Sequence, residues 1–279
     1  MLMLQTGQDI YNEDLYTTDY NSMKTTDIKK VNLTNFMTQD SIRVFEQWTK
    51  FYTVFSFDQT FDAFSRFRTG EMPLVVQPYT FYNQLSVAAP EIKGLWDFTM
   101  VPGTKQADGT INHAANSAGS GAVIFNKVSN QAAAWDFVKW FTSTDIQVDY
   151  GKQIEALMGP MGRFDTANVE ALEQLPWSTA EYEKISSQQS YLREVPIIPA
   201  SYAVTRHINN AFRMVVNDAG NPRYTLMSYN DQIKSEIVRK YQRIEIAQSH
   251  KLGELYHVEV RKAHRQRKQH RYDRKDRKE

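Results

Sequence analysis

The stretch from Arg66 to Tyr82, RFRTGEMPLVVQPYTFY, most constrains how this chain can fold. Gly70 can adopt the positive φ that ends a helix, and the apolar residues Met72 to Val76 are typical of a buried strand in a parallel sheet. Pro78 turns the chain just beyond that strand, where open α/β sheets usually bind ligands. The aromatic residues at this position are Tyr79, Phe81 and Tyr82. They predict either a binding cleft or an aromatic core that closes the edge of the sheet, and both interpretations remain open.

Length and composition indicate an ordinary globular protein. The chain has 279 residues, of which 41% are hydrophobic, so it can bury a sizeable core in one or two domains. No apolar run is long enough to span a membrane, and the first residues lack the basic and apolar regions of a signal peptide. We therefore expect no export signal in this chain. The absence of cysteine excludes disulfides, thiolate metal sites and a cysteine nucleophile.

The net charge of +1 conceals an asymmetry along the chain. Residues 261–279 contain ten Lys or Arg and three acidic residues, whereas residues 1–260 contain 23 basic and 29 acidic residues. The basic segment could bind nucleic acid or anionic lipid through counterion release. Its low apolar content and interleaved acids favour a solvated, disordered or frayed helical end.

Apolar periodicity and polar caps predict several helices. Their expected ranges are 39–52, 58–67, 131–143, two within 145–175 that are separated by the breaker at 158–162, 178–192, 201–219 and 225–241. Two further strands are expected at Trp96 to Val101 and Ala122 to Phe125. The proline-containing segment 195–199 is expected to be an extended crossing. The tryptophans expected to lie in cores are Trp96, Trp135 and Trp140.

Motifs of common catalytic sites do not occur. The six histidines form no HExxH pattern, and the chain contains no P-loop, no GxGxxG and no GxSxG. Three carboxylates, Glu71, Asp97 and Glu155, could be imagined as the acids of a glycosidase, but their spacing brings no two of them together. The sequence therefore predicts no catalytic residues, no bound metal and no cofactor.

Four motifs in order resemble the sugar-type, maltose-binding-protein-like solute-binding proteins of ABC importers (extracellular solute-binding protein family 1). They are FSRFRTGEMPLVVQPYTFYNQL (64–85), WDFTMVPGT (96–104), NSAGSGAVIFNKVSNQAAAWDFVKWFTS (116–143) and VPIIPASYAVTRHINNAFRMVVND (195–218). The resemblance covers about residues 38–246 and is to the C-terminal part of such a protein. It implies an α/β fold of the periplasmic-binding-protein-like type II, in which two lobes joined by a hinge close on a solute.

Carried over to this chain, the resemblance implies a second, C-terminal lobe of residues 1–112 and 192–246. Residues 118–165 would be a remnant of the first lobe, 166–191 a helical connection, and 247–279 the basic tail. Most of the N-terminal lobe would be missing, so we expect a fragment whose upstream part carried the signal peptide and a lipoprotein-type cysteine. The remnant would then lack the sheet on which it packs.

The resemblance also implies a set of sugar-binding residues. A pyranose packs its C–H face on an aromatic ring and needs polar partners for its hydroxyls. Tyr79 matches the stacking position, with Phe81 and Tyr82 as alternatives. The expected polar contacts are Gln77, Ser117, Ser120, Tyr202, Arg206 and Asn209, although Arg206 could equally form a structural ion pair. Gly119 and Gly121 are the expected hinge.

The sequence thus predicts a monomeric binding component that takes up a carbohydrate or oligosaccharide and delivers it to a membrane permease of an ABC importer. The full-length protein would act at the extracellular face of the cytoplasmic membrane or in the periplasm. It is not expected to be an enzyme or to bind nucleic acid. The alternatives are a glycan-processing enzyme and a nucleic-acid or membrane-surface adaptor that acts through the basic tail.

Overall fold

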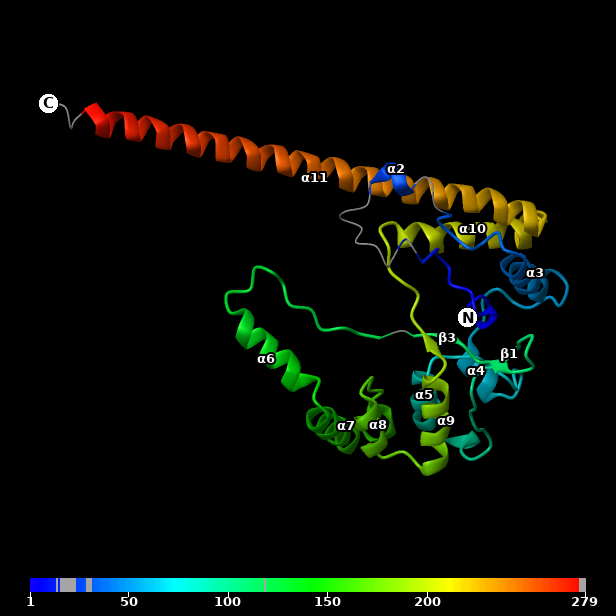
Figure 1. Ribbon diagram of the computed structural model, residues 1–279. Helices are drawn as coiled ribbons and strands as arrows, with labels where there is room; N and C mark the ends of the chain where they lie inside the picture. Colours follow the sequence, from blue (N-terminus) through cyan, green and yellow to red (C-terminus); the bar gives the residue numbers. More distant parts are fainter. Residues whose placement is uncertain (14, 16–23, 29–31, 118, 276–279) are drawn as a thin grey trace. The chain divides into compact units, whose positions relative to one another are not determined.

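The chain divides into two compact units. The computed structural model describes residues 1–13, 15, 24–28, 32–117 and 119–275, with side chains as far as Ser249. Unit 1 comprises Met1–Gly7 and Phe57–Val195, and unit 2 comprises Gln8–Ser56 and Pro196–Glu279. The secondary structure is mixed α/β, mostly helical with few and short strands (Figure 1).

Unit 1 is built from short helices and two pairs of short strands. Its helices are η1 (Leu4–Thr6), α4 (Ala63–Arg68), α5 (Thr80–Ala88), η2 (Pro90–Ile92), α6 (Gln131–Phe141), α7 (Thr144–Met158), η3 (Gly159–Gly162), α8 (Val169–Gln174) and α9 (Thr179–Gln189). Strand β1 (Thr104–Lys105) pairs antiparallel with β2 (Ile111–Asn112), and β3 (Ala115–Asn116) pairs parallel with β4 (Leu192–Arg193). The parallel pair joins segments that lie far apart in the sequence.

The buried Gln5 side chain ties the N-terminal turn η1 to the β1 region of unit 1. Its amide nitrogen donates to the Pro102 carbonyl at 2.8 Å, and its amide oxygen accepts from the Thr104 hydroxyl at 3.0 Å. The Gln5 carbonyl accepts from the Gln106 side chain at 2.9 Å. These bonds satisfy a buried amide that would otherwise be costly to enclose.

Local capping signals explain where several helices begin. Thr38 accepts a hydrogen bond from the Ser41 backbone N–H before α3 (Gln39–Thr53), and Asn130 accepts one from Ala133 before α6. Ser178 and Glu181 form a complete capping box at the start of α9. The predicted helices at 39–52, 131–143 and 178–192 are therefore confirmed, with ends that differ by one to three residues.

Three predicted strands are wrong. Residues 72–76, 96–101 and 122–125 have no strand assignment, and the side chains of Leu74 and Val123 are 87% and 77% exposed. An apolar run becomes a strand only when another strand pairs with it, and Pro73 removes a backbone donor from the first of these runs. Residues 96–101 bond to other parts of unit 1 instead, since the Val101 N–H donates to the Gln188 side chain at 2.9 Å.

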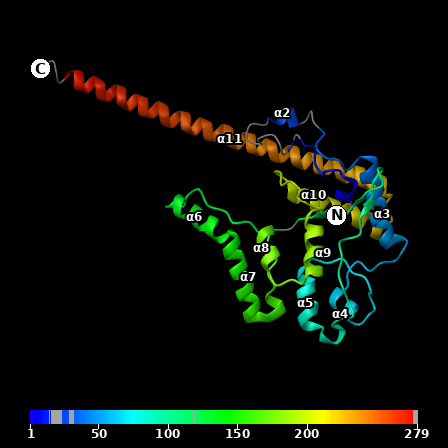
Figure 2. The ribbon, with the colours of Figure 1, turned by 60° about the horizontal axis from the view of Figure 1, so that its bottom comes forward.

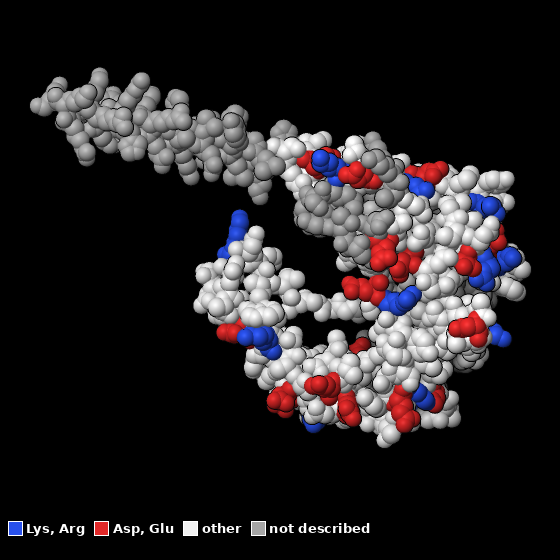
Figure 3. All heavy atoms as spheres, viewed as in Figure 1, with Lys and Arg blue, Asp and Glu red and all other residues white. Residues whose placement is uncertain are grey.

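Helix α6 has no buried residue, although its sequence is strongly apolar. Trp135, Phe137 and Trp140 are each more than half exposed. The expectation that Trp135 and Trp140 belong to cores is therefore wrong, whereas Trp96 is half-buried. In the view of Figure 3 the surface over α6 carries few charged side chains.

Unit 2 is organised around two long helices. Its helices are α2 (Thr25–Ile28), α3 (Gln39–Thr53), α10 (Ser201–Asp218) and α11 (Pro222–Lys275). Helix α10 ends before Gly220, as predicted, and Pro222 occupies the first position of α11, where its missing N–H costs nothing. Helices α10 and α11 lie side by side, and α3 packs on both (Figures 1 and 2).

The core of unit 2 is mainly apolar and encloses a buried polar pair, Thr34 and Asn230. Its most deeply buried residues on the long helices include Ala203, Ala211, Leu226, Ile233 and Ile237. Trp48 of α3 stacks on Phe212 of α10 with ring centroids 4.4 Å apart. The Thr34 hydroxyl donates to Asn230 Oδ1 at 2.5 Å, which satisfies one polar atom of this buried amide.

His207 is a buried titratable group in this core. It is 8% exposed, and neither ring nitrogen has a hydrogen-bond partner among the described residues. Its ring lies 6.1 Å from that of Tyr229 of α11. Burial lowers the pKa of His207, the charge of Arg206 lowers it further, and Glu236 opposes the shift.

Acidification should therefore destabilise unit 2. The folded protein favours neutral His207 while the unfolded chain binds the proton more readily, so stability is lost as pH falls from the ordinary histidine pKa of about 6.5 toward the lowered value. Thermal melts between about pH 7 and about pH 5 should show this fall, and His207→Gln should reduce it. An identical pH dependence in the variant would contradict the assignment.

The division into units does not follow the lobe boundaries expected from the sequence. It separates Ser56 from Phe57 and Val195 from Pro196, whereas the expected lobe of residues 1–112 and 192–246 spans both units. The lobe assignment stays a prediction.

Candidate functional site

The segment before α5 is shaped by a glycine and two prolines. Gly70 has φ +78°, and its N–H donates to the Phe67 carbonyl at 3.0 Å, which confirms that it ends helix α4. Residues 74–78 have no regular secondary structure, and Gln77 is exposed. Pro78 starts a turn that leads directly into α5, because the Phe81 N–H donates to the Pro78 carbonyl at 2.9 Å.

Tyr79 and Tyr82 form an aromatic cluster with Trp177. The rings of Tyr79 and Tyr82 are nearly parallel, with centroids 5.9 Å apart and an interplanar angle of 12°. Trp177, between α8 and α9, meets both edge-on at 5.3 and 5.8 Å. Trp96 and Phe98 contact Tyr82 from other sides at 5.4 and 5.5 Å. We call Tyr79, Tyr82 and Trp177 the aromatic cluster.

Phe81 turns toward α4 and away from this cluster. Its ring makes edge-on contacts with Phe64 and Phe67 at 6.5 and 6.1 Å. This separation follows from the helix, because residues 79 and 82 share one face of its first turn and residue 81 does not.

Arg163 connects the aromatic cluster to two carboxylates. Its Nε donates to Glu155 at 3.0 Å, and a terminal nitrogen donates to the Tyr82 hydroxyl at 2.8 Å. The guanidinium carbon lies 4.7 Å from the Trp177 ring centroid and 5.4 Å from that of Tyr82. The Tyr82 hydroxyl in turn donates to Glu181, which lies 3.7 Å from Arg163.

The electrostatics keep the hydroxyls of this cluster protonated. Burial raises the pKa of Tyr79 far above its ordinary value, despite the nearby charge of Arg163. Burial and the hydrogen bond to Glu181 raise the pKa of Tyr82. Although burial alone would raise it, hydrogen bonds from Tyr82 and Ser178 hold the pKa of Glu181 below its ordinary value. Both tyrosines are therefore neutral, and Glu181 is an ionised acceptor.

Two ring-bound polar atoms in the aromatic cluster have no hydrogen-bond partner within the described chain. They are the Tyr79 hydroxyl and the Trp177 Nε1, and both are buried. On the same helix face as Tyr79, the Oδ1 of Asn83 is also buried without a partner, although its Nδ2 donates to the Arg163 carbonyl at 3.0 Å. Such atoms are uncommon in folded proteins and call for an explanation.

The remaining predicted residues of unit 1 lie near β3. The Ser117 N–H donates to the Arg193 carbonyl at 3.0 Å beside the parallel strand pair. Ser120 is exposed, as are Gly119 and Gly121. A Cβ built on either glycine meets no atom within 4 Å.

The predicted residues of unit 2 share the exposed face of α10. Tyr202, Arg206 and Asn209 lie four and three positions apart, opposite the buried face of the helix. Arg206 pairs with Glu236 at 3.4 Å, and its guanidinium lies 6.0 Å from the Tyr202 ring centroid. The structural ion pair considered for Arg206 is thus present.

The carboxylates considered for glycan cleavage have separate basic partners. Glu71 lies 3.7 Å from Arg66, Asp97 lies 2.5 Å from Lys184, and Glu155 lies 3.0 Å from Arg163. Among the described residues, no group of three or more histidines and carboxylates could hold a metal ion. No helix in that part of the chain is both long and apolar enough to cross a membrane.

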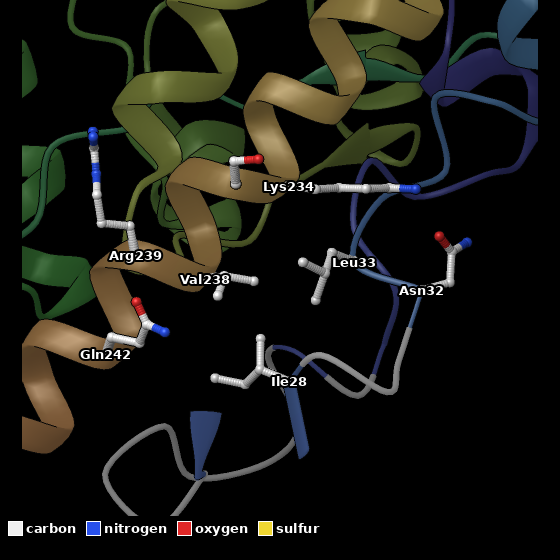
Figure 4. Close-up of a pocket in the computed structure, with 8 residues that line it drawn as sticks. Ile28, Asn32, Leu33, Lys234, Val238, Arg239 and Gln242 are labelled. Atoms are coloured by element: carbon white, nitrogen blue, oxygen red, sulfur yellow. The ribbon is translucent and has the colours of Figure 1, made fainter. Parts of the chain in front are cut away.

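A separate hollow of about 560 Å³ lies in unit 2. Ile28, Leu33 and Val238 face it, and polar side chains of α11 surround it (Figure 4). Residues 29–31, between Ile28 and Asn32, fall outside the described residues, and we assign no ligand to this hollow.

Trp177 was not among the residues predicted from the sequence. The signal that could have found it is the capping box at Ser178 and Glu181, which fixes the start of α9 and places Trp177 just before it. The contact with Tyr79 spans almost a hundred residues and depends on the tertiary packing of separate segments, which no local pattern reveals.

Comparison with known proteins agrees with the four sequence motifs at the level of the family. The matching family model is described as bacterial extracellular solute-binding protein, and it covers residues 2–148. No curated protein matches the chain. The family implies a periplasmic-binding-protein-like fold, a bound solute and a role with an ABC permease. This chain therefore belongs to the bacterial extracellular solute-binding proteins.

Proposed function

We propose that this protein binds a carbohydrate or oligosaccharide outside the cytoplasmic membrane and delivers it to the permease of an ABC importer. The family supports solute binding for ABC transport. The aromatic cluster carries the finer proposal that the solute is a sugar, because it combines ring faces with buried, neutral hydrogen-bonding groups. Sugars need both kinds of contact.

Binding without cleavage is the function that the carboxylates favour. A glycosidase needs two carboxyl groups that face the scissile bond, one of them protonated. Glu71, Asp97 and Glu155 are each paired with a different basic side chain, and the hydrogen bond from Lys184 lowers the pKa of Asp97. The proposed protein therefore has no turnover of its own.

Other elements of the proposal concern the remaining residues. We keep Gln77, Phe81, Ser117 and Ser120 as solute contacts of unit 1, and Tyr202, Arg206 and Asn209 as solute contacts of unit 2. Gly119 and Gly121 are proposed as the hinge, which their open surroundings and their position just after the β3–β4 pair support. The protein is proposed to act as a monomer.

Isothermal titration calorimetry of the full chain tests this function directly. The titrants are a panel of mono- and oligosaccharides, with amino acids and short peptides as alternative solutes. Saturable binding of a carbohydrate, with a melting temperature that rises with its concentration, supports the proposal. Binding of a peptide but of no carbohydrate would agree with the family assignment and would contradict the proposal that the solute is a sugar.

Tyr79→Ala should weaken carbohydrate binding by about 1–3 kcal/mol, the scale of one lost aromatic contact. Calorimetry on the variant measures the loss. The control is Tyr224→Ala, which removes a 67% exposed tyrosine of α11 and should leave the affinity unchanged. Equal affinities of Tyr79→Ala and wild type would favour the alternative in which the aromatic residues are only core.

A further inference from the structure

Trp177 is held in a fixed position by its surroundings. Pro176 precedes Trp177, and the Trp177 N–H donates to the Leu175 carbonyl at 2.7 Å. Ser178, the next residue, caps α9. The guanidinium of Arg163 covers one part of the ring, with its carbon 4.7 Å from the centroid. The backbone and a cation–π contact thus determine where the indole lies.

Packing alone does not explain the polar atoms of the aromatic cluster. Phenylalanine at positions 79 and 177 would supply rings without a hydroxyl or an indole N–H. Both of these groups are instead buried and have no partner in the described part of the protein. A buried donor without an acceptor destabilises the protein, whereas the same donor binds tightly when an acceptor arrives.

The chemistry of the two groups defines what would satisfy them. The indole N–H can only donate, and the neutral phenol of Tyr79 can donate or accept. The two rings are in edge-on contact, with centroids 5.3 Å apart. A single hydroxyl group suits this pair, because its oxygen can accept from Trp177 and its proton can be donated to Tyr79.

We infer that Trp177 is a further solute-contacting residue, and that its indole N–H and the Tyr79 hydroxyl together bind one hydroxyl group of the solute. The inference rests on the proposed carbohydrate function and deepens it. Because both atoms are buried in the structure, the Tyr79 side chain moves away from the fixed indole of Trp177 far enough to admit that hydroxyl when the solute binds. Arg163 is a positioning residue, because its guanidinium holds the indole of Trp177 in place.

Two variants of the full chain test this assignment by calorimetry with the carbohydrate that wild type binds most tightly. Tyr79→Phe removes one oxygen, and Trp177→Phe removes the indole N–H. Each should weaken binding about tenfold. Tyr79→Phe should leave the melting temperature unchanged or raise it, because it removes a buried group without a partner. Weaker binding at unchanged or higher stability is a result that a purely structural role would not produce.

Trp96→Phe is the matched control for loss of ring volume. Trp96 is also half-buried and meets Tyr82 edge-on at 5.4 Å, close to the 5.8 Å of Trp177. The Trp96→Phe variant should bind the carbohydrate as wild type does, even if its melting temperature falls as far as that of Trp177→Phe. Arg163→Lys keeps the positive charge but loses the planar contact with the indole. This variant should bind the carbohydrate more weakly, although its thermal melt shows that it is folded.

The outcomes separate this inference from the function on which it rests. Wild-type affinity in Trp177→Phe, or an equal loss in Trp96→Phe, overturns the role of Trp177 and leaves carbohydrate binding intact. A wild-type protein that binds no carbohydrate of the panel overturns both. Tenfold losses in Tyr79→Phe and Trp177→Phe, with an unchanged Trp96→Phe, support the shared hydroxyl.

Discussion

Replacing Ile233 with alanine should lower the free energy of unfolding by about 2–5 kcal/mol. Ile233 is 0% exposed on α11, the helix that packs on α10 and α3 in unit 2. The truncation removes three methyl or methylene groups from the packed core. It leaves a cavity that the surrounding helices can close only in part. Such a loss is a large part of the total stability of an ordinary domain.

Urea denaturation followed by far-ultraviolet circular dichroism measures this effect. Ile246→Ala provides the control, because it makes the same change on the same helix at a side chain that is 57% exposed. The control should stay within about 0.5 kcal/mol of wild type. Equal losses in the two variants would mean that Ile233 does not lie in a packed core.

Leu172→Ala should destabilise unit 1 by a similar amount, about 2–5 kcal/mol. Leu172 is 1% exposed on α8, next to the fully buried Ala171, and α8 packs on α7. These helices are short, so each depends on its tertiary contacts more than on its own propensity. Loss of one fully buried leucine therefore removes much of what holds α8 in place.

Val169→Ala is the control on the same helix, since its side chain is 59% exposed at the first position of α8. Thermal and urea unfolding of both variants give the comparison. A Leu172→Ala protein as stable as Val169→Ala would contradict the packing of α8. Separate unfolding transitions for the Leu172 and Ile233 variants would show that the two units unfold independently.

Helices could be predicted from this sequence because their signals are local. Thr38, Asn130 and Ser178 each cap a helix within three residues of themselves, and the Gly70 turn follows from the freedom of glycine to adopt positive φ. Strands could not be predicted as well, because a strand needs a partner elsewhere in the chain. The apolar run at 72–76 has the composition of a strand but no pairing among the described residues.

The candidate site was predictable in part for the same reason. Tyr79 and Tyr82 lie three residues apart at the start of a helix, so their common face follows from the sequence. Trp177 and Arg163 reach them through the packing of separate elements, which periodicity does not reveal. An amphipathic pattern likewise shows that α6 has an apolar face, but not whether anything covers Trp135 and Trp140.

The exposed indoles of α6 also determine how the protein will behave spectroscopically. Of the five tryptophans, Trp135 and Trp140 are more than half exposed, so their emission is red-shifted and readily quenched by iodide, whether or not a solute is bound. Trp177 is half-buried, as are Trp48 and Trp96, so the emission of these three lies at shorter wavelength beneath that background. A fluorescence titration will therefore report on the aromatic cluster only after both α6 tryptophans are changed to phenylalanine.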